Sequence, residues 1–206
     1  MPEPSPLFEG HRVVFAGDSV TDCGRRDGND GLGNGYVRLL ADNAALAGAD
    51  VVNRGIGGDR AEDLARRWDT DVLAERPRVI SVMIGINDTW RRYDAGQETG
   101  THTFLARYRS LLERIAPDTR LVLMEPFLLP VTDEQQSWRE DLDPKIEAVH
   151  RLAKEFGAVL VRTDAALNAA VAAGASPQSL ADDGVHPTER GHAVIAEAWL
   201  NAVHHA

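Results

Sequence analysis

The sequence predicts an α/β fold built on a parallel sheet, and three observations support this class. Five short β-branched apolar runs recur along the chain, these runs do not alternate with polar residues, and longer stretches of helical periodicity separate them. An apolar run without polar alternation is typical of a strand that helices cover on both faces. Strands that alternate with helices indicate repeated βα units that feed one parallel sheet.

Five strands are expected, over the ranges Arg12–Ala16, Asp50–Asn53, Val79–Gly85, Arg120–Glu125 and Ala158–Val161. Three apolar stripes with spacings of three and four residues predict helices that pack on this sheet. The stripes are Phe104, Tyr108, Leu111, Leu112 and Ile115; Ile146, Val149, Ala153 and Phe156; and Val194, Ile195, Ala198 and Trp199. We interpret the aromatic and leucine side chains in these stripes as core.

Two segments, 88–100 and 126–138, are expected to be long loops. Each follows the carboxyl end of a predicted strand, which is where open α/β sheets bind ligands. Long loops at that edge are usually functional. We therefore expect these two segments to form walls of a site.

The length and composition predict a single domain, residues 1–206. The chain has 206 residues, of which 43% are hydrophobic, and this is enough for one substantial core but short for two domains. The net charge of −10 arises from 32 acidic and 22 basic residues spread along the chain. Because nucleic acids and anionic membranes are also negative, neither is expected as a partner.

Cys23 is the single cysteine, so one chain cannot form an internal disulfide or a thiolate metal cluster. The N-terminal segment 1–8 has three prolines and no apolar signal-peptide core, and no window approaches the roughly 20 apolar residues of a membrane span. These features predict a cytoplasmic location. The histidines lack metal-ligand spacing and no dinucleotide or P-loop motif is present, so no metal or cofactor is expected.

Gly17, Asp18 and Ser19 follow the first predicted strand directly. Because a glycine permits a sharp turn, the Ser19 hydroxyl is expected at the carboxyl edge of the sheet, where it is a candidate nucleophile. This segment alone leaves two alternatives open. Ser19 can instead cap the next helix, or the backbone N–H groups can bind phosphate.

Near the other end of the chain, Asp183 precedes His186 by three residues, and Gly184 and Pro187 predict a turn there. Such a turn can fold the Asp183 carboxylate onto the Nδ1–H of His186, which leaves Nε2 free to accept a proton from a serine. On its own, this spacing more often forms an ordinary ion pair. Together with Ser19, it predicts a catalytic triad.

Two further segments are candidates for an oxyanion hole. In the segment after the second strand, glycines up to Gly58 allow a backbone N–H to approach a ligand closely. After the third strand, the side-chain amide of Asn87 can donate to the same oxygen, as acyl transfer requires. The alternatives are turn geometry for the glycines and an Asx-turn or helix cap for Asn87.

The order and spacing of these segments resemble the four conserved blocks of the SGNH (GDSL-like) hydrolase superfamily, over nearly the whole chain. The segments are 17–19, 53–58, 85–88 and 183–187. The resemblance implies a flavodoxin-like three-layer α/β/α fold with a five-stranded parallel sheet. It also implies that Ser19 is the nucleophile, that Asp183 and His186 are its triad partners, and that the oxyanion donors are Ser19, Gly58 and Asn87.

Three longer stretches, 17–25, 83–94 and 124–127, resemble intracellular acetylxylan esterases that deacetylate imported xylo-oligosaccharides. This resemblance implies a serine esterase that removes acetyl groups from acetylated sugars through an acyl-enzyme, without a cofactor. One position departs from that group, in which an aromatic residue can precede the triad aspartate. This chain has Asp182 there.

The candidate substrate-binding residues are Asp18, Trp90, Arg91 and Tyr93. The last three belong to a polar and aromatic run that can stack on a sugar and form hydrogen bonds with it. The alternative is that this run packs against its own domain or against a neighbouring subunit. Since relatives of this type often assemble, a homo-oligomer is consistent with the resemblance.

Two other functions stay open at this stage. The first is a short-chain carboxylesterase, a lysophospholipase or an acyl thioesterase that acts on non-carbohydrate substrates. A lipid-directed enzyme needs an apolar acyl channel, which the charged segments 88–100 and 126–138 do not obviously supply. The second is a sugar-binding module without catalysis, against which the presence of all the chemical residues argues.

Overall fold

The computed structural model describes residues 7–28 and 30–206. Its sheet has five parallel strands in the order β2-β1-β3-β4-β5, which is the flavodoxin-like order that the resemblance implies. The strands are β1 (Arg12–Gly17), β2 (Asp50–Gly55), β3 (Val79–Met83), β4 (Arg120–Met124) and β5 (Val159–Val161). The predicted fold class is therefore confirmed, and each strand end lies within two residues of its expected position.

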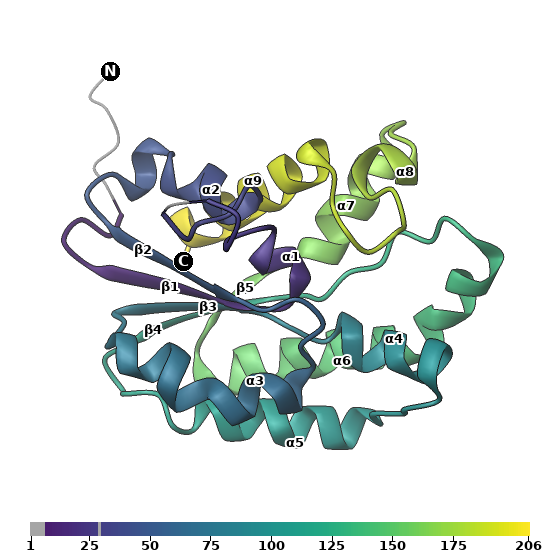
Figure 1. Cartoon of the computed structure of the whole chain (residues 1–206), viewed down its shortest axis with the longest axis horizontal. Helices are drawn as coiled ribbons and strands as arrows, with labels where there is room; N and C mark the ends of the chain where they lie inside the picture. Colours follow the sequence, from purple (N-terminus) through teal and green to yellow (C-terminus); the bar gives the residue numbers. More distant parts are fainter. Residues whose placement is uncertain (1–6, 29) are drawn as a thin grey trace.

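Helices cover both faces of the sheet (Figure 1), with α2, α7 and α9 on one face and α3, α5 and α6 on the other. The α-helices are α1 (Ser19–Asp22), α2 (Tyr36–Ala41), α3 (Ala61–Arg67), α4 (Ile86–Ala95), α5 (Thr101–Leu112), α6 (Asp133–Phe156), α7 (Thr163–Ala172), α8 (Pro177–Leu180) and α9 (Glu189–His204). Short 3-10 turns at Ala44–Leu46 and Leu73–Glu75 and a π-helical turn at Trp68–Val72 lie between them.

Neighbouring residues of the strands point into two different apolar clusters, as expected for a sheet that is buried on both faces. Val13 and Phe15 pack with α2 and α9, whereas Val14 and Ala16 pack with α3, α5 and α6. The three predicted helical stripes lie in α5, α6 and α9, except that Ile115 follows the end of α5. This packing brings the carboxyl ends of the strands to one edge.

The segment 88–100, expected to be a loop, is mostly helical because α4 begins at Ile86, directly after the turn at Gly85. Only residues 96–100 lie outside helices. The second expected loop is also shorter than predicted. It ends where Thr132 caps α6, so Trp138 is a helical residue.

α6 is a helix of 24 residues that contains Pro144. Proline has no N–H, so the helix lacks one backbone hydrogen bond at this point. Across it, Asp141 and Lys145 form a buried ion pair one turn apart, and Arg92 of α4 donates to the same carboxylate at 3.0 Å. The bond from Arg92 holds α4 against α6.

Within residues 7–28 and 30–206, the helices are too short or too polar to cross a membrane.

Candidate active site

Ser19 begins α1 two residues after a position that only glycine can occupy. A Cβ on Gly17 would lie 2.3 Å from the Met83 carbonyl oxygen and 2.4 Å from Thr21 Oγ1, which is far inside van der Waals contact. Asp18 then caps the helix, since its carboxylate accepts a hydrogen bond from the Val20 N–H at 3.0 Å. The sharp passage from β1 into α1 leaves Ser19 partly exposed at the edge of the sheet.

The structure brings Ser19, His186 and Asp183 into one hydrogen-bonded line. Ser19 Oγ lies 3.0 Å from His186 Nε2, and His186 Nδ1 lies 2.6 Å from Asp183 Oδ2. A carboxylate only accepts, so Nδ1 carries the ring proton and Nε2 is left as an acceptor for the serine hydroxyl. This arrangement is the one that a serine nucleophile needs for deprotonation.

The turn at 183–186 holds the Asp183 carboxylate in its ionised form. Burial opposes ionisation, but hydrogen bonds from the N–H groups of His186 and Val185 and from the His186 ring outweigh it and lower the pKa of Asp183. Gly184 has a φ of +85°, and a Cβ there would lie 2.6 Å from the Leu129 carbonyl oxygen. Glycine is therefore required for this turn to form.

Gln135, which the sequence analysis did not single out, anchors the same turn from α6. Its Nε2 donates to the Asp183 carbonyl oxygen at 2.7 Å, and its Oε1 accepts from the Val131 N–H at 2.9 Å. Leu129 N–H adds a bond of 2.9 Å to the Gly184 carbonyl oxygen. A single buried glutamine in a helix carries no motif, so no signal in the sequence pointed to it.

The segments of the predicted oxyanion hole meet beside Ser19. A Cβ built on Gly57 would be 3.8 Å from Ser19 Cβ, and the neighbouring Gly58 has a φ of +83° with open space around it. Asn87 is 3% exposed, and its Nδ2 donates to the Asp59 carbonyl oxygen at 3.0 Å. The amide keeps a second N–H, which is available to a ligand.

A family model described as the GDSL-like Lipase/Acylhydrolase family matches residues 15–194, a range that includes both ends of the line from Ser19 to Asp183. The chain belongs to this family. As a GDSL-like hydrolase it is a carboxylic ester hydrolase, and its α/β sheet has the arrangement that its relatives share.

Two named relatives define the likeness to other GDSL-like proteins. The acetylxylan esterase of Geobacillus stearothermophilus is 38% identical over 211 residues, which cover 96% of this chain and 95% of that protein. The crystal structure of a catalytic mutant of that enzyme gives a TM-score of 0.87 at 36% identity, over 96% of this chain and 95% of that one. A putative GDSL-like lipase from Parabacteroides merdae also gives 0.87, at 33% identity over 97% and 98% of the two chains.

In this GDSL-like hydrolase, Asp18 is 1% exposed, so its carboxylate faces the interior, which differs from the predicted contact with substrate. Burial, with smaller contributions from the charges of Asp59 and Asp88, raises the pKa of Asp18 to about 7. Burial likewise raises the pKa of Asp88 to about 6. Asp88 Oδ2 accepts from the Ala61 N–H at 2.9 Å, which joins the start of α3 to α4.

Trp90, Arg91 and Tyr93 lie on α4 and are all partly exposed. Trp90 packs beside the triad, because its ring centroid is 5.8 Å from that of His186. Tyr93 stacks on Trp138 of α6 at 5.3 Å, so this part of the run packs against its own fold. The result is an aromatic wall next to the imidazole.

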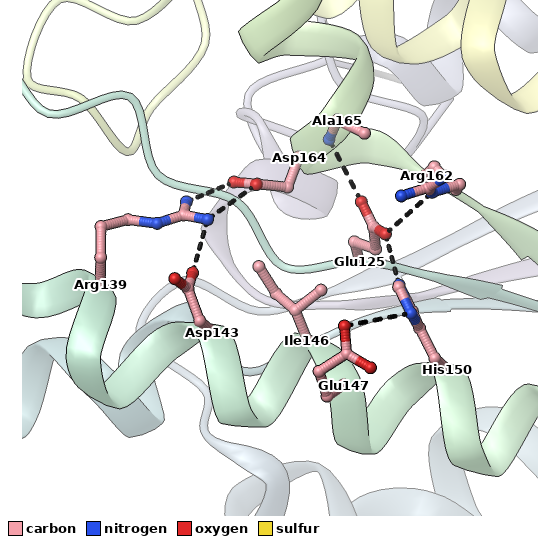
Figure 2. A pocket seen from close by; sticks show the side chains of 9 residues that line it. All are labelled: Glu125, Arg139, Asp143, Ile146, Glu147, His150, Arg162, Asp164 and Ala165. Atoms are coloured by element: carbon pink, nitrogen blue, oxygen red, sulfur yellow. Dashed lines mark hydrogen bonds and ion pairs between the residues drawn. The ribbon is translucent and has the colours of Figure 1, made fainter.

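A second group of charged side chains lines a hollow of about 260 Å³ at the carboxyl ends of β4 and β5 (Figure 2). Its acids and bases pair with one another. Arg139 donates two hydrogen bonds to Asp164, at 2.7 and 3.0 Å, and His150 Nε2 lies 2.5 Å from Glu125 Oε1. Among the residues that the structure describes, no group of three or more His, Cys, Asp or Glu side chains is arranged to hold a metal ion.

Proposed function

We propose that this hydrolase removes acetyl groups from acetylated xylo-oligosaccharides through an acyl-enzyme on Ser19. The observation that carries the proposal is the hydrogen-bonded line from Ser19 Oγ through the His186 ring to the Asp183 carboxylate, with separations of 3.0 and 2.6 Å. A hydroxyl, an imidazole and a carboxylate in this order are the three groups that convert a serine into a nucleophile.

In the first half of the reaction, His186 Nε2 takes the hydroxyl proton as Ser19 Oγ attacks the acetyl carbonyl carbon. Asp183 holds the ring and stabilises the imidazolium. The tetrahedral oxyanion accepts hydrogen bonds from the Ser19 N–H, the Gly58 N–H and the Asn87 amide. As the C–O bond to the sugar breaks, the leaving oxygen takes the proton from Nε2.

In the second half, a water molecule gives a proton to His186 Nε2 and attacks the acetyl group on Ser19. A second tetrahedral oxyanion forms in the same hole. Its collapse returns the proton to Ser19 Oγ and releases acetic acid, which ionises to acetate in water, so the enzyme regains its starting state without a cofactor.

Solved structures of the Geobacillus stearothermophilus enzyme support these roles. Three of them are described as catalytic mutants, in which a serine, an aspartate and a histidine are each replaced by alanine. The aspartate and histidine of that enzyme stand three positions apart, as Asp183 and His186 do. The relative's name, acetylxylan esterase, supports the proposed acetyl-sugar substrate.

The side chains around His186 also suit a sugar. Trp90 offers a partly exposed aromatic face 5.8 Å from the imidazole, and the Arg91 guanidinium lies 5.9 Å from the centre of the Trp90 ring. An aromatic face packs on the C–H face of a pyranose, and a guanidinium donates to hydroxyl groups. We propose that Trp90 and Arg91 bind the sugar, and that the partly exposed Tyr93, which also stacks on Trp138, contacts it at its border.

A panel of esters tests this function. We expect acetate release from acetylated xylo-oligosaccharides, turnover of p-nitrophenyl acetate, and little turnover of p-nitrophenyl esters with long acyl chains. Ser19→Ala should keep the fold and lose nearly all turnover, and a serine-directed phosphonate should label the wild type at Ser19 alone. A preference for long chains would remove the acetyl-sugar substrate, and an unlabelled Ser19 would remove Ser19 as the nucleophile.

Three further expectations concern the domain organisation, the location and the assembly of the enzyme. We propose that residues 1–206 form a single domain, that the enzyme acts in the cytoplasm, and that it assembles as a homo-oligomer. Limited proteolysis, cell fractionation and light scattering, respectively, test them.

A further inference from the structure

Arg67, the last residue of α3, connects two segments of the site, one at Gly17 and the other at residues 54–59. Its Nη2 donates to the Gly17 carbonyl oxygen at 3.1 Å, its Nη1 to the Arg54 carbonyl oxygen at 2.8 Å, and its Nε to Asp59 Oδ2 at 2.7 Å. The Arg67 and Asp59 side chains are each 12% exposed, so these bonds are largely shielded from water.

The two carbonyl groups lie where the sheet ends. Gly17 is the last residue of β1, two positions before Ser19, and Arg54 is the next-to-last residue of β2. A guanidinium presents five donors in a rigid plane, so it holds its acceptors in fixed relative positions. Arg67 therefore fixes the approach to Ser19 relative to the end of β2.

Asp59 extends this connection to the two other oxyanion donors. It directly follows Gly58 in the chain, and its carbonyl oxygen accepts the hydrogen bond from Asn87 Nδ2 at 3.0 Å. Asp59 is thus held by Arg67 through the Asp59 carboxylate, and it orients the Asn87 amide through the Asp59 carbonyl group. Each proposed donor lies within two residues of, or is bonded to, a group that contacts Arg67.

We propose that Arg67 is a positioning residue of the oxyanion hole, which holds the N–H groups of Ser19 and Gly58 and the Asn87 amide in the arrangement that the oxyanion needs. This inference rests on the proposed acyl-enzyme mechanism at Ser19. Arg67 itself does not touch the substrate in this role, because it acts through Gly17 and Asp59. A misplacement of catalytic groups by about 1 Å costs about 10²-fold in rate, so such a role is measurable.

Arg66 supplies a matched control from the same helix. Its side chain is 68% exposed and pairs with Asp63 and Glu62 within α3. Arg67→Ala and Arg66→Ala therefore remove the same side chain from neighbouring positions, but only the first removes contacts with the site.

The test measures kcat and KM for p-nitrophenyl acetate in both variants, after circular dichroism has verified their folding. For Arg67→Ala we expect kcat to fall by about 100-fold and KM to change by less than about threefold, because the hole binds the transition state and not the ground state. Guanidinium ion at non-denaturing concentration should raise the kcat of Arg67→Ala by at least about tenfold. Arg66→Ala should stay within about twofold of wild type and show no response to guanidinium.

A double-mutant cycle with Asn87→Ala separates positioning from general stability. If Arg67 acts by orienting Asn87, the fold-loss in kcat caused by Arg67→Ala should be at least about fivefold smaller in the Asn87→Ala background than in the wild type. A role in stability alone predicts that the two losses multiply. If Arg67→Ala does not fold, Arg67→Lys and Asp59→Asn enter the same cycle in its place.

An Arg67→Ala kcat within about twofold of wild type, or multiplicative losses without guanidinium rescue, would overturn the inference. Failure of the proposed Ser19 mechanism looks different. In that case the wild type and Ser19→Ala have equal activity on every ester.

Discussion

Two carboxylate–histidine pairs lie at the same edge of the sheet, and only one of them contacts a serine hydroxyl. Asp183 Oδ2 lies 2.6 Å from His186 Nδ1, and Glu125 Oε1 lies 2.5 Å from His150 Nε2. The Glu125 pair lies in the charged hollow of Figure 2. By distance alone the two contacts are the same.

The second ring nitrogen separates the two pairs. His186 Nε2 faces Ser19 Oγ at 3.0 Å, whereas His150 Nδ1 faces Glu147 Oε1 at 3.6 Å. A hydroxyl can give up a proton to the ring, but an ionised carboxylate has no proton to give and can only accept a hydrogen bond. The comparison teaches that the group bonded to the second ring nitrogen determines whether a carboxylate–histidine pair can accept a proton from a nucleophile.

Neutralising the carboxylate of each pair tests this difference, with the largest effect that we predict. Asp183→Asn should lower kcat by about 10⁴-fold, because an amide no longer selects the ring tautomer that accepts the serine proton. Glu125→Gln, which keeps the size of a side chain that is 2% exposed, should leave kcat within about threefold. Steady-state rates on p-nitrophenyl acetate measure both. Equal losses in the two variants would contradict the distinction.

A third histidine, His192, sharpens the comparison because its nitrogens face other groups. Nδ1 accepts from the Tyr36 N–H at 3.1 Å, and Nε2 lies 3.2 Å from Cys23 Sγ. Burial lowers the pKa of His192 to about 4. As the pH falls below the unfolded value of about 6.5, the unfolded chain takes up a proton that the folded chain excludes, so stability falls.

We expect His192→Gln to reduce the loss of unfolding free energy between pH 7 and pH 5 by about 2 kcal/mol relative to wild type. The comparison between variants is needed because Asp18 and Asp88, whose pKa values burial raises, favour the folded chain as the pH falls over the same range. Urea titrations at the two pH values measure the difference. The exposed His204 at the end of α9 gives the control His204→Gln, and identical pH slopes in all three proteins would refute the assignment.

Gln135 tests the support of the catalytic turn. Gln135→Ala removes the bond of 2.7 Å to the Asp183 carbonyl oxygen, and we expect kcat to fall about tenfold and stability by about 1 to 2 kcal/mol. The exposed neighbour Gln136 supplies the control Gln136→Ala, for which we expect neither change. Kinetics and thermal melts of both variants decide. A loss of stability without a loss of kcat would show that the turn positions itself.

The smallest predicted effect concerns the aromatic wall, which borders His186 but not His150. Trp90→Leu should raise KM for acetylated xylo-oligosaccharides by about fivefold, a cost of about 1 kcal/mol, and should raise KM for p-nitrophenyl acetate less. Trp90→Phe, which keeps an aromatic face, should recover part of the loss. Equal changes for both substrates would mean that Trp90 supports His186 and does not bind the sugar.

The sequence predicts the triad segments well because each follows a strand or forms a turn with its own chemistry. A parallel sheet brings all its carboxyl ends to one edge, so naming the strands already places Ser19 and Asn87 near each other. The approach of Asp183 and His186 follows from the local Asp-x-x-His turn. These features depend on short-range patterns and on the topology of the sheet.

The parts that the sequence did not reveal depend on tertiary contacts. The polar segment 88–100 has few apolar residues, yet α4 forms there because Trp90 and Tyr93 pack on Trp138 and Arg92 pairs with Asp141 of α6. Arg67 resembles any other helical arginine until the fold places three acceptors around it. A residue whose role depends on distant partners has no local signature.

The separation of 167 positions between Ser19 and His186 has a consequence for biosynthesis. A nascent chain that has left the ribosome up to Val161 contains every strand of the sheet, yet it lacks the imidazole and its carboxylate. The proposed nucleophile therefore gains its proton acceptor only after the segment with Asp183 and His186 has emerged. Until that segment docks on the sheet, the Ser19 hydroxyl has no imidazole beside it.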